Sequence, residues 1–76
     1  MPVFRVGDIV QYERGTDWGA GNEKLFQVKS IRAVGSHMDL MQLVPYYTMY
    51  NGANTSWFEH ADPFIAAVWK ARLANG

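Results

Sequence analysis

The sequence predicts a mainly β domain that ends in one α-helix. Short segments rich in β-branched and aromatic residues, separated by Gly, Asn or Pro, fill most of the chain. Near the C-terminus, apolar residues instead recur at helical spacing. The chain has 76 residues, of which 49% are hydrophobic and 18% charged, so we expect a single folded domain over 1–76.

Four or five antiparallel strands are expected from these segments. They cover residues 8–13, 24–32, 38–44, 46–50 and 54–59. In the first strand Val10 and Tyr12 point to one face and Ile9 to the other, because successive side chains alternate. In the second strand Phe26 and Val28 share a face. Each of these strands therefore offers an apolar face to a core.

A glycine-rich segment separates the first two strands. Its glycines between Gly15 and Gly21 favour a loop over a helix or strand. Trp18 stands among them with little local structure to bury it. We expect Trp18 either to pack back onto the sheet or to contact a ligand at the loop tip.

The dipeptide Asn51-Gly52 predicts a β-hairpin. It is the preferred pair of a two-residue type I′ turn, because both positions need a positive φ. That register places Tyr46 opposite Trp57, a favourable cross-strand aromatic pair.

Four aromatic residues on or beside the predicted hairpin form a candidate binding surface. They are Tyr46, Tyr47, Tyr50 and Trp57. Such rings can stack on a base, a sugar or a proline-rich peptide. The other interpretation is that they pack against the sheet or the C-terminal helix.

The helix is expected over residues 63–74. Asp62 is suited to the N-cap and Pro63 to the first helical position. Lys70 and Arg72 lie near the negative end of the helix dipole. One apolar stripe is predicted, made of Phe64, Ile65, Val68, Trp69 and Leu73.

The N-terminal half of the chain resembles a known family of small β-barrels. Phe-Arg-Val-Gly-Asp-Ile-Val at 4–10, a glycine-rich loop, and Phe-Gln-Val-Lys-Ser-Ile at 26–31 are similar to the opening of SH3-like barrels. Similar openings occur in KOW-type modules, in small bacterial and phage proteins and, more distantly, in type II dihydrofolate reductases. The resemblance implies an SH3-like barrel, but one fold serves many functions.

Neither enzymatic nor KOW-type function follows from this resemblance. The reductases carry a Val-Gln-Ile-Tyr strand near the C-terminus, whereas residues 55–58 read Thr-Ser-Trp-Phe here. The chain also lacks the basic loop of KOW modules: its seven cationic residues balance seven acidic ones. Lys24, Lys29 and Arg32 on the second strand form only a modest basic patch.

No catalytic, cofactor or metal site is assigned. The absence of cysteine excludes disulfides and thiolate chemistry. Two His-x-Asp pairs, His37 with Asp39 and His60 with Asp62, have chelating spacing, but Asp62 already serves as the N-cap. We expect ordinary surface roles for these pairs.

The expected function is a non-enzymatic interaction module that binds protein and associates with itself. On folding, a domain this small buries only about 60% of the surface that its unfolded chain exposes. A partner subunit would bury more apolar surface and so add stability. One alternative is a nucleic-acid-binding module that uses the aromatic hairpin with Lys24, Lys29 and Arg32. The second is an oligomeric small-molecule binder or enzyme with its site at a subunit interface. No signal peptide or membrane span is expected, which favours the cytoplasm.

Overall fold

The computed structural model describes residues 3–15 and 23–75. Its strands are β1 (Ile9–Tyr12), β2 (Leu25–Arg32), β3 (His37–Val44), β4 (Thr48–Asn54) and β5 (Phe58–His60), and its helix is α1 (Pro63–Asn75). Two short 3-10 turns lie at Ala33–Gly35 and Thr55–Trp57. The five strands form one antiparallel sheet in the order β4-β3-β2-β1-β5. The predicted mainly β class with a C-terminal helix is confirmed.

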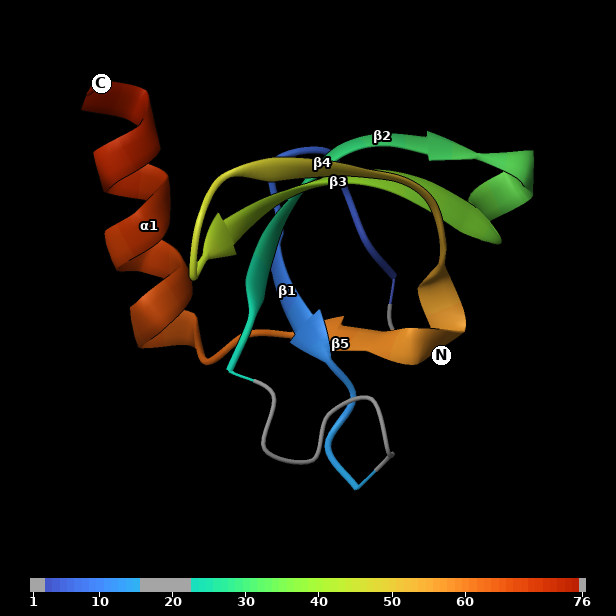
Figure 1. The fold of residues 1–76 in the computed structure, drawn as a ribbon, viewed down its shortest axis with the longest axis horizontal. Coiled ribbons are helices and arrows are strands. Elements are labelled where there is room, and N and C mark those ends of the chain that lie inside the picture. Colours follow the sequence, from blue (N-terminus) through green and yellow to red (C-terminus); the bar gives the residue numbers. More distant parts are fainter. Residues whose placement is uncertain (1–2, 16–22, 76) are drawn as a thin grey trace.

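The sheet curls around its core (Figure 1). β2, β3 and β4 arch over one side, β1 and β5 cross the other, and α1 stands at one end. The strand pairing of the described residues leaves β4 and β5 as edges, so the sheet is not closed. The SH3-like resemblance therefore stays a prediction, while the curled antiparallel sheet is what the structure has.

The concave side of the sheet holds the main core. Its buried members are Phe4, Val10, Phe26, Val28, Met38, Leu40, Ala53 and Phe58. Tyr12 stacks on Phe58 with ring centroids 4.9 Å apart, and Phe26 meets Phe58 edge-on at 5.5 Å. The alternation predicted for the first two strands therefore places the expected residues inside.

The convex side is partly covered by α1, which stands at one end of the sheet. Ile9, Leu43 and Ala61 form a second buried cluster there, and Ala66, Trp69 and Leu73 of the helix pack against it. The helix begins as predicted, because Oδ1 of Asp62 accepts the backbone N–H of Phe64 at 2.9 Å.

Only part of the apolar stripe predicted for the helix is buried against the sheet. Trp69 and Leu73 face the sheet, but Phe64, Ile65 and Val68 are exposed. The helix has apolar residues around most of its circumference, so spacing alone does not specify which side meets the sheet.

The hairpin predicted at Asn-Gly is also wrong. The dipeptide lies inside β4, which runs on without reversing and pairs with β3. Met38 pairs with Ala53 and Leu40 with Tyr50, so β4 has one more residue than β3 over this stretch. Gly52 takes a positive φ of 72°. A β-bulge uses a left-handed glycine just as a type I′ turn does, which is why the sequence signal misled.

The chain reverses earlier, between β3 and β4, where the Val44–Pro45 peptide is cis. The expected pairing of Tyr46 with Trp57 therefore does not form. Trp57 belongs to the 3-10 turn Thr55–Trp57 and packs on the concave core. That turn occupies part of the predicted fifth strand, which is shortened to β5.

Candidate functional site

The aromatic residues proposed as one binding surface lie in two different places. Tyr50 and Trp57 are half-buried against the concave core. Tyr46 and Tyr47 are exposed, at 67% and 63%, in the turn between β3 and β4. Trp18 lies outside the described residues. The four described aromatics therefore do not form one stacking platform.

The three candidate cations are also dispersed. Lys24 borders a groove beside Ile65, whereas Lys29 borders another groove beside Lys70. Arg32 forms an ion pair with Asp39. A shared basic patch on β2 is therefore absent from the described part of the chain.

Asp39 is the centre of a polar cluster that ties three strands together. Its carboxylate in β3 accepts hydrogen bonds from Arg32 and Ser30 in β2 and from the backbone N–H of Gly52 in β4. The hydrogen bonds from Arg32, then those from Ser30 and Gly52, lower the pKa of Asp39 from its usual 3.8 to about 2. The role of Asp39 in this structure is therefore to connect the three strands.

The two His-x-Asp pairs do not assemble into a metal site. His60 contacts the carbonyl oxygen of Val3 through Nε2 at 3.0 Å, and Asp62 caps the helix. Nδ1 of His37 contacts the Ser36 hydroxyl instead of a carboxylate. Within residues 3–15 and 23–75, no group of three His, Cys, Asp or Glu side chains is placed to hold a metal ion.

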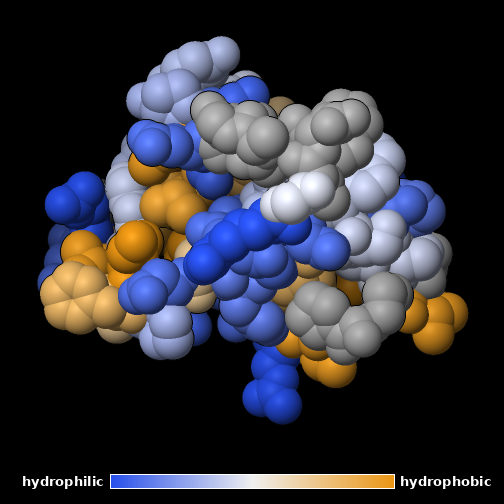
Figure 2. All heavy atoms as spheres, turned by 90° about the horizontal axis from the view of Figure 1, so that it is seen from below, coloured by the Kyte–Doolittle hydropathy of each residue, from blue (hydrophilic) through white to orange (hydrophobic). Residues whose placement is uncertain are grey.

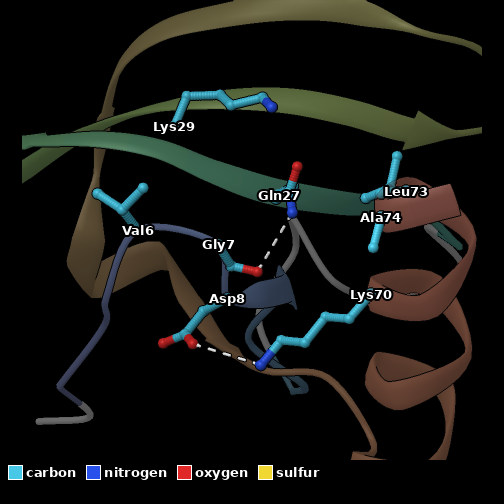
Figure 3. Close-up of a pocket in the computed structure, with 8 residues that line it drawn as sticks. All are labelled: Val6, Gly7, Asp8, Gln27, Lys29, Lys70, Leu73 and Ala74. Carbon is cyan, nitrogen blue, oxygen red and sulfur yellow. Dashed lines mark hydrogen bonds and ion pairs between the residues drawn. The ribbon is translucent and has the colours of Figure 1, made fainter. Parts of the chain in front are cut away.

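One groove runs along one flank of α1 and has a volume of about 520 Å³ (Figure 3). It is lined by Val6, Gly7, Asp8, Gln27, Lys29, Lys70, Leu73 and Ala74. Asp8 accepts the backbone N–H of Arg5 at 2.8 Å and lies 3.8 Å from Nζ of Lys70. Asp8 and the carbonyls at the helix C-terminus offset the charge of Lys70, which lowers the attraction of this groove for anions.

A second groove, of about 390 Å³, lies on the other flank of the helix. It is lined by Gln11, Glu23, Lys24, Leu25, Val44 and Ile65. Ile65 and Ala74 are about two and a half turns apart at 3.6 residues per turn, so the two grooves lie on opposite sides of α1. Ile65 connects the second groove to the exposed part of the helix.

Another candidate interface is the side of α1 that faces away from the sheet. We define the outer face of α1 as Phe64, Ala67, Val68 and Ala71. All four are exposed, Phe64 at 76% and Val68 at 43%, and Ile65 beside them is 42% exposed. Figure 2 shows hydrophobic residues gathered on the side of the molecule where α1 lies in Figure 1.

The composition of α1 makes this exposure unusual. Of its thirteen residues only Lys70 and Arg72 are charged. A helix that is apolar around its circumference is characteristic of burial on all sides. Here the sheet covers only the side with Trp69 and Leu73. The low charge of the segment is visible in the sequence, but the sequence does not show that Ala67 and Ala71 face away from the sheet.

Comparisons with protein-family models, with curated proteins and with solved structures gave no match. The candidate site therefore rests on the geometry of this chain alone. No helix in the described part of the chain is long and apolar enough to cross a membrane.

Proposed function

We propose that the protein is a non-enzymatic interaction module that associates with copies of itself through the outer face of α1. The observation that carries this proposal is the apolar helix with only one covered side. A contiguous exposed apolar surface on a small domain is typical of a protein-binding site.

The expected affinity is weak. Fully burying a large apolar side chain gains about 1.5–3 kcal/mol, and two copies contribute two Phe64 and two Val68 side chains. Because Phe64 is 76% and Val68 43% exposed before association, the gross gain is about 4–7 kcal/mol, against an association cost of about 4–15 kcal/mol. We therefore expect a dimer that forms at high protein concentration.

The nucleic-acid alternative has less support. Arg32 is paired with Asp39, and Lys24 and Lys29 border different grooves. Binding to a phosphate backbone favours several cations that follow one surface. The exposed turn tyrosines alone do not supply that charge.

Light scattering behind size exclusion tests the proposal. We expect a mass above the monomer's 8.6 kDa that rises with protein concentration and persists in high salt, because apolar contacts are not screened. The double variant Phe64→Ser, Val68→Ser should run as a monomer of nearly unchanged stability. Tyr47→Ser is the matched control, since Tyr47 is 63% exposed but lies in the β3–β4 turn.

Two results would contradict the proposal. One is an 8.6 kDa monomer at every concentration. The other is association that survives the double variant but is lost in Tyr47→Ser, because the interface would then lie at the turn.

A further inference from the structure

We infer that the outer face of α1 packs against the same face of a second copy, with the two helices antiparallel about a two-fold axis beside Ala67 and Val68. This inference rests on the proposed function and specifies its partner and geometry. It follows from how residue sizes are arranged along the helix and from the direction of the helix dipole.

Residue size favours the antiparallel arrangement. The outer face has the large Phe64 at its N-terminal end and the small Ala71 at its C-terminal end. Turning a second helix around the midpoint of this face sets Phe64 opposite the partner's Ala71. The large ring then fills the space that alanine leaves, and the helices can approach closely. A parallel pair would instead set two phenylalanines against each other.

The helix dipoles favour the same arrangement, because antiparallel dipoles attract each other and parallel dipoles repel. The charged side chains near the ends of α1 do not oppose it, since they are engaged within their own chain. Lys70 lies 3.8 Å from Asp8, Arg72 lies over the ring of Trp69, and Asp62 caps the helix.

The arrangement is self-limiting. In a two-fold contact both copies use the same surface. The outer face of α1 is then buried in the dimer, and no third copy can bind to it. The inference therefore predicts a dimer at high concentration and no larger species through this face.

Single cysteines test the geometry directly, because the chain contains none. Packed helices lie about 8–10 Å apart, and a disulfide needs Cα atoms about 4.4–6.8 Å apart. Ala67→Cys lies beside the proposed axis and meets its own copy. Ala71→Cys is displaced from its copy by about 10 Å along the helix at 1.5 Å per residue.

We expect mild oxidation to link Ala67→Cys into a covalent dimer and to leave Ala71→Cys unlinked. A mixture of Phe64→Cys and Ala71→Cys chains should form the mixed disulfide. Val68→Cys, on the other side of the axis, repeats the first test. Both alanines are exposed, so far-ultraviolet circular dichroism should show the native fold in each variant.

The outcomes separate the two proposals. Linkage of Ala71→Cys as readily as Ala67→Cys would show parallel helices and overturn the inference. If neither Ala67→Cys nor Val68→Cys links while the wild type is dimeric by light scattering, the antiparallel geometry is wrong and self-association stands. A wild-type chain that is monomeric at all concentrations overturns both.

Discussion

The two sides of the sheet are packed in different ways. On the concave side Phe26 and Phe58 are at most 1% exposed and contact each other within one aromatic cluster. On the convex side α1 contains no fully buried residue, and Trp69 and Leu73 are only half-buried. The concave core is complete within one chain, whereas the convex layer leaves apolar surface for another.

Side chains at the edge of the concave core are also packed by residues of the same chain. Burial, followed by the neighbouring Tyr50, raises the pKa of Tyr12. The ring of Tyr12 also contacts Phe26 edge-on at 5.4 Å. Even the partly exposed ring of Tyr12 therefore packs against other side chains of the same chain. No comparable set of contacts covers Phe64 on the helix, which is 76% exposed.

Replacing one core residue on each side of the sheet should give the largest difference in unfolding free energy between the two sides. Phe26→Ala removes a fully buried ring and is expected to cost about 3–5 kcal/mol of unfolding free energy. That is a large share of the about 5–15 kcal/mol typical of a domain. Leu73→Ala, from the half-buried side of α1, should cost clearly less. Urea unfolding followed by circular dichroism measures both, and equal losses would remove the contrast between the two sides.

The helix cap should give a smaller and more local effect. Asp62→Ala removes the acceptor for the first N–H groups of α1 and should cost about 0.5–2 kcal/mol. If the convex layer is the less stable part, amide exchange should accelerate in α1 while β2 and β3 keep their protection. Asp62→Asn keeps an acceptor and is the control. Equal acceleration in sheet and helix would mean that the two sides unfold together.

The strands and their buried faces could be predicted from the sequence because alternation is a local pattern. Val10 and Tyr12 on β1, and Phe26 and Val28 on β2, lie on the concave side as expected. The N-cap role of Asp62 was predictable for the same reason, since it depends only on the next few residues.

The errors arose where a local signal has two structural solutions. Gly52 satisfies a positive φ in a bulge as well as in a hairpin turn, and only the pairing of β4 with β3 decides between them. The helix gave a similar ambiguity, because Val68 and Trp69 are both apolar and only the sheet's shape selects which is covered. The outer face of α1, the basis of the proposed site, could not be located before that choice was known.

Acid should destabilise the sheet by a smaller amount, through the three-strand cluster of Asp39. The side chain of Asp39 lies on the face opposite to the concave core, because its neighbours Met38 and Leu40 are buried there. Because the folded state lowers the pKa of Asp39 from 3.8 to about 2, its contribution is complete above pH 3.8 and is lost as the pH falls toward 2. Asp39→Asn should flatten this part of a profile of unfolding free energy against pH. Some slope should remain, because the Arg14 backbone N–H also lowers the pKa of Glu59. Glu59→Gln is therefore the matched control. A profile unchanged by Asp39→Asn would mean that the cluster joining β2, β3 and β4 adds nothing to the stability of the sheet.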